Sequence, residues 1–288
     1  MKIHIKKVDI AVISIVALFT VIAILLIFSL TGGILKEALT AILLLLIVTI
    51  VLLSGINMYR RIEKTNKKLL QLLNKKLPET QKGISAQTEA MFWLVQQISP
   101  AYPLPGTNTW NLPPDTINSI LSIIKEEAPN QVVELSGGIS TLIFSYVIDK
   151  GHIHSFHHEE PKVEKTLKII TKHGLHKKAS VSYAPLAPLY THGKERIWYH
   201  TDSIDRIAFI NMLIVSGPHA GDNENLLYTA LPHLYPKLKP GAVIVITHAN
   251  SPGAQATLKE WLRLHPLLKE EYMDTAEGLI ILRKPLVE

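Results

Sequence analysis

A glycine-rich turn follows a short apolar run in the middle of the chain. The run Val132-Val133 leads into Glu134-Leu-Ser-Gly137-Gly138-Ile-Ser140-Thr141. Glycines after a buried strand let the backbone turn tightly and approach a ligand closely, and the N-terminus of a following helix favours such contacts. The turn therefore predicts a ligand-binding loop, with an ordinary strand-to-helix turn as the alternative. A dinucleotide-binding loop is less favoured, because the spacing G-x-G-x-x-G is not met.

Four histidines stand in predicted loops at what would be one edge of a sheet: His157, His200, His219 and His248. Converging imidazoles bind zinc and other transition metals, and they favour an anionic ligand when protonated. The chain has 13 histidines, so some clustering is expected by chance. A metal site is therefore a hypothesis only, and no metal ligand is assigned. The absence of cysteine excludes disulfides and thiolate chemistry.

The elements that would position these residues are short apolar runs that alternate with helical patterns. Five runs indicate strands: 132–135, 152–156, 180–183, 212–215 and 242–246. Helical patterns include Gln87–Gln97, a helix that starts at Asn111–Asp115, Pro161–His173 and Asn223–Leu238. Such alternation is typical of an α/β fold with a doubly wound, mostly parallel sheet. The last two strands, 268–274 and 278–283, are close in sequence and predict an antiparallel hairpin.

The glycine-rich turn and the strands after it resemble the class I S-adenosylmethionine-dependent methyltransferases. The resemblance covers about Gln87 to Lys284 and continues through further motifs: Tyr183-Ala-Pro-Leu186, Trp198-Tyr199-His200, Val215-Ser-Gly-Pro218, Leu238-Lys-Pro-Gly241 and Val243–His248. It implies a seven-stranded Rossmann-like sheet, with S-adenosylmethionine bound outside the carboxyl ends of the strands. Glu134 would meet the positively charged part of the cofactor. The implied cofactor-binding residues are Glu134, Gly137, Gly138, Ser140, Thr141, His157 and Ser216.

Several acidic residues of the family's pattern are replaced in this chain. The replacements are His157 for the acid that binds the ribose hydroxyls, His200 in the Trp-Tyr-Asp pattern, Ser216 in Asp-Gly-Pro, and Thr247 and His248 for the paired acids after the fifth strand. Ser136 also replaces the first glycine of the loop. Loss of the ribose carboxylate would weaken cofactor binding by about 10- to 150-fold. His248 and His200 are the candidates for a catalytic base.

These departures leave three hypotheses for function. The first is a methyltransferase that acts on an unknown small-molecule, lipid or protein substrate. The second is a catalytically inactive scaffold or ligand sensor, a pseudoenzyme on the same fold. The third is a different enzyme that uses the histidine-rich crevice. Fold alone does not decide between them.

Two uncharged apolar runs precede this region, Ile10–Leu30 and Ala38–Met58. Each has about 20 residues, enough for a helix to cross a hydrocarbon core of about 30 Å. The short connection 31–37 predicts a helical hairpin, whereas a cleaved signal peptide would not explain the second run. Basic residues flank the outer ends of both runs, and the connection carries only Lys36. We therefore expect a multi-pass protein of the inner (cytoplasmic) membrane with both termini cytoplasmic.

The chain is thus divided into a transmembrane hairpin (1–58), a basic juxtamembrane helix and linker (59–82) and a methyltransferase-like domain (83–288), with a break at Pro78–Gly83. Apolar residues on the Lys-rich helix 62–77 predict contact with lipid headgroups, or a short coiled coil that makes a homo-oligomer. The net charge of +6 is concentrated beside the membrane, which favours anionic lipid. Nucleic acid is not expected, because no basic stripe interleaved with aromatics appears in the domain.

Overall fold

The computed structural model describes residues 19–22, 24, 26–27, 29, 33–191, 193–217 and 227–286, and at 35, 73, 75 and 77–79 it gives the backbone alone. The chain divides into two compact units, Met1–Glu79 and Thr80–Glu288. The second unit contains every strand that is described.

Helix α2 runs from Ile34 to Ile98 without interruption. The interruption of the helix predicted at Pro78–Gly83 is therefore wrong. A proline inside a helix removes one hydrogen bond of the helical ladder and often only kinks the helix. The residues around it are mostly Leu, Lys, Gln and Glu, which have high helix propensity, so the helix continues through the proline.

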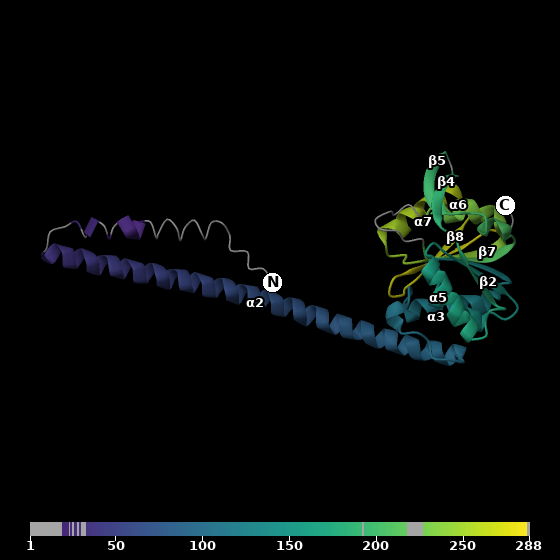
Figure 1. Cartoon of the computed structure of the whole chain (residues 1–288), viewed down its shortest axis with the longest axis horizontal. Coiled ribbons are helices and arrows are strands. Elements are labelled where there is room, and N and C mark those ends of the chain that lie inside the picture. Colours follow the sequence, from purple (N-terminus) through teal and green to yellow (C-terminus); the bar gives the residue numbers. More distant parts are fainter. Residues whose placement is uncertain are drawn as a thin grey trace. The chain divides into compact units, whose positions relative to one another are not determined.

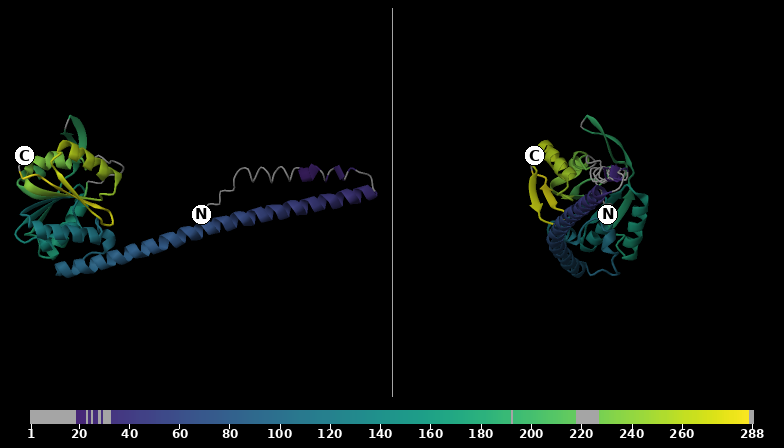
Figure 2. Two further views of the ribbon diagram at one scale, coloured as in Figure 1. Left: turned by 180° about the vertical axis from the view of Figure 1, so that it is seen from behind. Right: turned by 90° about the vertical axis from the view of Figure 1, so that its left-hand side faces the viewer.

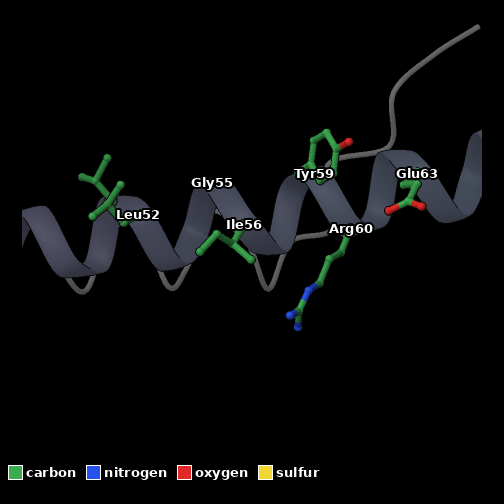
Figure 3. Close-up of a pocket in the computed structure, with 7 residues that line it drawn as sticks. Leu52, Gly55, Ile56, Tyr59, Arg60 and Glu63 are labelled. Atoms are coloured by element: carbon green, nitrogen blue, oxygen red, sulfur yellow. The ribbon is translucent and has the colours of Figure 1, made fainter.

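Among the described residues, one helical stretch, Lys36–Leu72, is long and apolar enough to cross a membrane. Its apolar side chains are exposed, as at Leu45 with 72% of its surface accessible. The apolar part ends at Tyr59 and Arg60, which extend to opposite sides of the helix beside a shallow hollow at Gly55 (Figure 3). The predicted first span, Ile10–Leu30, lies largely outside the described residues.

The second unit is built on a seven-stranded sheet in the order β3-β2-β1-β6-β7-β9-β8. Strands β1, β2, β3, β6 and β7 are parallel, and β9 pairs antiparallel with both β7 and β8. The bounds are β1 Gln131–Leu135, β2 His152–His157, β3 Ala179–Tyr183, β6 Ile210–Val215, β7 Leu238–Thr247, β8 Lys269–Met273 and β9 Leu279–Arg283. The predicted mostly parallel sheet and its C-terminal hairpin are confirmed.

Helices cover both faces of this sheet, and Figures 1 and 2 show the two layers. The first layer contains α3 Pro114–Glu127, α4 Ile139–Val147 and α5 Glu160–Lys172, and the second contains α6 Ala230–Leu234 and α7 Pro252–Leu264. Each layer has its own cluster of buried apolar residues. The core explains the apolar runs, because parallel strands covered on both faces need apolar side chains on both.

The helix predicted over Asn223–Leu238 is shorter than expected. Among the described residues 227–238, only α6 is α-helical, and a 3-10 turn at Tyr235–Lys237 follows it. Pro236 lacks the N–H that an α-helix would need at this point, which explains the early end. Residues 218–226 of the predicted helix and its preceding loop are outside the described part of the chain.

A separate antiparallel hairpin, β4 (Leu186–Thr191) and β5 (Lys194–Tyr199), was not predicted. It stands between β3 and β6 in sequence and does not join the main sheet. Trp198 and Tyr199 at its end are 0% and 1% exposed. The hairpin is therefore anchored to the core by these two aromatic side chains, and it brings Tyr199 to the glycine-rich turn.

Candidate functional site

The predicted site residues follow neighbouring strands at one edge of the sheet. Leu135 at the end of β1 is opposite both Phe156 of β2 and Val215 of β6, and Val215 is opposite Ile246 of β7. Parallel strands end at the same edge, so the residues that come next lie along it in one row. The row comprises His157, Ser136, Ser216, Thr247 and His248.

A cleft of about 360 Å³ opens at the glycine-rich turn. Its size is within the range of about 300–1,000 Å³ that is usual for small-ligand sites. The described residues that line it come from the segment before α3, the turn, the end of β2 and one face of α5: Asn108, Thr109, Trp110, Asn111, Ser136, Gly137, Gly138, Ile139, His157, Lys162, Lys165, Thr166 and Ile169. Of the predicted cofactor-binding residues, Gly137, Gly138 and His157 are among them.

Glu134 lies beneath the turn and is fully buried. Its two carboxyl oxygens accept hydrogen bonds of 2.5 Å from the hydroxyls of Ser140 and Thr141, in the first turn of α4. Ser155 of β2 completes this hydroxyl cluster, with its oxygen 3.1 Å from that of Thr141. Burial raises the pKa of the Glu134 carboxyl from 4.5 to about 7, although hydrogen bonds from the three hydroxyls lower the pKa in part.

These contacts give Glu134, Ser140 and Thr141 a role that sequence reasoning did not foresee. All three side chains are buried and none lines the cleft. They join the end of β1 to the start of α4, and so they fix the path of the turn between them. The carboxyl of Glu134 supports the loop from below and is not part of the cleft lining.

The two glycines of the turn are used differently. A Cβ at Gly137 would lie 2.4 Å from a carboxyl oxygen of Glu134 and 2.1 Å from the hydroxyl of Ser155, so no side chain fits there. A Cβ at Gly138 would meet nothing nearer than Asn111, at 3.9 Å. Gly137 is therefore required by packing, whereas Gly138 leaves space on the side of the cleft.

Ser136 adopts a left-handed conformation with φ +63°, which costs a non-glycine residue about 1–2 kcal/mol. Three contacts hold it in place. Its hydroxyl is 2.6 Å from that of Tyr199, its N–H donates to Phe156, and its carbonyl accepts from the Asn111 amide. Burial raises the pKa of the Tyr199 hydroxyl well above its ordinary value. Tyr199 is thus a neutral hydrogen-bonding partner of the turn.

His157 lies at the end of β2 and is 5% exposed. Its Nδ1 accepts a hydrogen bond of 2.9 Å from the backbone N–H of Glu159. Burial, with the nearby His158 and Lys162, lowers the pKa of His157 to about 4, so the ring is neutral at pH 7. A neutral imidazole that accepts at Nδ1 carries its hydrogen on Nε2. His157 is therefore a donor at a position where the family's pattern has an acceptor.

The two candidate bases do not line the cleft. His248 has φ +52° and its Nδ1 pairs with the Glu277 carboxylate. His200 is half exposed, with its Nδ1 3.8 Å from a carboxyl oxygen of Asp202. Ser216 is 2% exposed and also lies outside the lining. His219 falls outside the described residues, and among those described no three metal-ligating side chains lie together.

Asn111, Lys162 and Lys165 were missed by sequence reasoning although they line the cleft. The two lysines belong to the first turns of α5, directly after His157. A sequence signal for Lys162 existed, because it stands three residues after Glu159, and Lys165 is three residues further along the same helix face. The signal was overlooked because a Lys-rich face of a helix is usually interpreted as solvent-exposed surface.

Comparisons with solved structures identify the fold of this domain. The SAH-bound methyltransferase PaMTH1 of Podospora anserina superposes with a TM-score of 0.51 and 12% identity, over 72% of this chain and 95% of that one. The fold is that of the class I methyltransferases. A methyltransferase from Geobacter sulfurreducens (TM-score 0.47, 11% identity, 69% and 89% covered) and the SAH complex of a Bacillus cereus O-methyltransferase (0.46, 14%, 69% and 90%) are also similar. No protein-family model matches the sequence, and no curated protein matches it.

The different surroundings of the two glycines give the first prediction. Gly137→Ala should lower the free energy of unfolding by about 1–3 kcal/mol, because its methyl group overpacks the hydroxyl cluster. Gly138→Ala, the matched control, should change that free energy by less than about 0.5 kcal/mol. Urea denaturation followed by tryptophan fluorescence measures both values. Equal effects of the two substitutions would contradict the packing argument.

The buried carboxyl gives the second prediction. The folded state holds the Glu134 proton more tightly than the unfolded chain, so this stabilisation is complete below pH 4.5 and is lost as the pH rises through 7. Relative to Glu134→Gln, the wild type should lose about 3 kcal/mol of unfolding free energy between pH 4.5 and pH 8. Comparison with the variant cancels other titrating groups. A difference that stays constant with pH would show that the carboxyl is not buried.

Proposed function

We propose that this chain is a membrane-anchored protein of the methyltransferase type that binds S-adenosylmethionine in the cleft at Gly138. The observation that carries the proposal is that cleft. It lies outside the carboxyl end of β1, beside the start of α4, and Gly138 leaves it open. In doubly wound sheets, cofactors bind at this edge. PaMTH1, a protein with the same fold, was crystallised with SAH bound, which supports a cofactor of this kind.

The residues present fit such a cofactor in size and in loop geometry. The volume of about 360 Å³ suits an adenosine derivative, and Trp110 and Ile169 provide apolar lining. His157 would donate from Nε2 to a ribose oxygen, and Asn111 holds the turn through the Ser136 carbonyl. The bound cofactor would supply an electrophilic methyl group. Transfer would then require a bound acceptor held in line, which depends mainly on proximity and orientation.

A non-catalytic ligand sensor or scaffold is the second candidate, and specific contacts favour it. His248 is paired with Glu277, His200 is exposed, and neither lines the cleft. No carboxylate occurs among the described residues that line the cleft, and the accepting nitrogen of His157 is occupied by the Glu159 N–H, so neither supplies a free general base there. An acceptor that needs no deprotonation, or one that approaches His248 from the other side of the row, would still be compatible with methyl transfer.

Membrane attachment forms the other half of the proposal. The exposed apolar surface of Lys36–Leu72 would be covered by lipid, and Tyr59 and Arg60 would lie at the interface (Figure 3). We propose two spans, Ile10–Leu30 and Ala38–Met58, with both termini in the cytoplasm, because basic residues flank the outer ends. Ile62, Leu69 and Leu72, each about half exposed, would contact headgroups or a second copy. The substrate would be one that is available at a membrane surface.

Calorimetric titration tests the cofactor. The detergent-solubilised full chain should bind S-adenosylmethionine and SAH with micromolar affinity. Gly138→Val should weaken both by at least about 10-fold, because its side chain enters the cleft. Gly83→Val, at an open position of α2, should leave both unchanged. Absence of binding to a folded chain at millimolar ligand would reject the cofactor. Binding without transfer of a labelled methyl group to membrane extracts would favour the sensor.

Cysteine labelling tests the topology, since the chain has no cysteine of its own. Single replacements Lys2→Cys, Ile34→Cys and Ser85→Cys place a thiol before the first span, between the spans and after the second. In intact cells a membrane-impermeant maleimide should label Ile34→Cys only. After lysis all three should react. Labelling of Lys2→Cys in intact cells would instead indicate a single span.

A further inference from the structure

The charge of the cleft is opposite to what a cationic cofactor would select. Two lysines line it and no described lining residue is acidic. Lys162 forms an ion pair with Glu159 at 2.7 Å, whereas Lys165 has no ion pair within the described part of the chain. S-adenosylmethionine carries a sulfonium, an ammonium and one carboxylate, so its net charge is positive. A cleft with an uncompensated lysine favours a ligand with negative charge.

The position of the positive charge is specific. His157 ends β2, and α5, which carries the lysines, starts three residues later. In doubly wound nucleotide-binding folds an acid near the end of the second strand binds ribose hydroxyls, and a basic residue there accommodates a ribose phosphate. Lys162, Lys165 and Thr166 are spaced i, i+3 and i+4, so they share one face of α5, the face that lines the cleft.

The hydrogen-bonding pattern agrees with the charge. His157 Nδ1 is occupied by the Glu159 N–H, which leaves Nε2–H as the group of this ring that can contact a ligand. A donor of this kind suits a phosphate oxygen at least as well as a hydroxyl. The Lys165 ammonium adds a further donor, whereas the Thr166 hydroxyl already donates to the Lys162 carbonyl at 2.8 Å. No carboxylate among the described lining residues is present to accept the two ribose hydroxyl protons together.

We propose that the cleft binds a nucleoside whose ribose carries a phosphate at its 2′ or 3′ oxygen, with His157 and Lys165 as the residues that select the phosphate. The base would pack on the apolar lining of Trp110 and Ile169. The inference uses the cleft of the proposed function but does not depend on methyl transfer. It concerns binding only, and no bond is made or broken.

Calorimetry of the full chain in uncharged detergent, at low and at physiological salt, tests the inference. The probes are adenosine 3′-monophosphate, adenosine 2′-monophosphate, adenosine 5′-monophosphate, SAH and inorganic phosphate. A 2′- or 3′-phosphate should bind at least about 10-fold more tightly than the 5′-phosphate. Lys165→Ala should weaken that binding by roughly 10- to 100-fold, whereas the affinity for SAH should change by no more than about twofold. Lys168→Ala, on the same helix but outside the lining, is the matched control.

A second variant tests independently whether His157 helps to select the phosphate. His157→Asp introduces the acceptor that the chain lacks, and its carboxylate can still accept the Glu159 N–H. His157→Asp should lower the affinity for the 2′- and 3′-phosphates by about 10-fold or more and raise the affinity for SAH. If both variants fail to fold, the preference of the wild type for the 2′- or 3′-phosphate over the 5′-phosphate and inorganic phosphate remains the deciding measurement.

The outcomes separate this inference from the proposed function. Binding of SAH without any preference for ribose phosphates overturns the inference and leaves the proposed cofactor intact. Tight, Lys165-dependent binding of a ribose phosphate without SAH binding supports the inference and rejects the cofactor. Equal binding of all phosphates, inorganic phosphate included, would mean a non-specific cationic surface and would also overturn the inference.

Discussion

The hydrogen bonds from Ser140 and Thr141 to the buried carboxyl of Glu134 are the constraint on which the candidate site depends. A carboxyl with no solvent exposure is costly unless its oxygens are satisfied, and here the hydroxyls at the start of α4 satisfy them. The carboxyl therefore fixes the distance between the end of β1 and the first turn of α4. Only a glycine fits at position 137 between them, and this places Gly138 at the cleft.

A second set of contacts, made by Ser136, fixes the same turn. The strain of Ser136 in the left-handed region is held by the hydroxyl of Tyr199 and the amide of Asn111. Tyr199 belongs to the hairpin β4–β5, and Asn111 precedes α3. Three segments distant in sequence thus meet at one serine. A glycine there would remove the strain, but it would also remove the hydroxyl that joins the turn to the hairpin.

Much of this fold could be predicted because its causes are local. Buried parallel strands such as Ala242–Ile246 are apolar on both faces, and Pro114 suits the first turn of α3. The hairpin β4–β5 was missed because Pro188 interrupts β4 and three charged residues begin β5, so neither gives a clear strand pattern. The continuous α2 was missed because Pro78 was taken as the end of a helix, whereas a proline can be accommodated within one.

The site was predictable in place but not in detail. Ser136, His157, Ser216 and His248 lie on one edge because the strand order demands it. Which way each side chain faces depends on packing across elements, and the sequence does not contain that information. Glu134 has the residue type for a ligand contact but is used to support the turn, and the lysines of α5 resemble a solvated face but line the cleft.

The geometry and the electrostatics of the site point in different directions, and this contrast guides the interpretation of function. The turn, the open position at Gly138 and the cleft volume match a nucleoside-binding edge of this fold. The charged groups do not match a cationic cofactor, because His157 donates where an acceptor is expected and Lys165 is not neutralised by any described residue. Backbone geometry restricts the shape of a ligand, whereas the side chains at the rim select its charge. A chain that keeps the backbone geometry of the turn but changes the side chains at the rim retains a nucleoside site and changes which nucleoside it prefers.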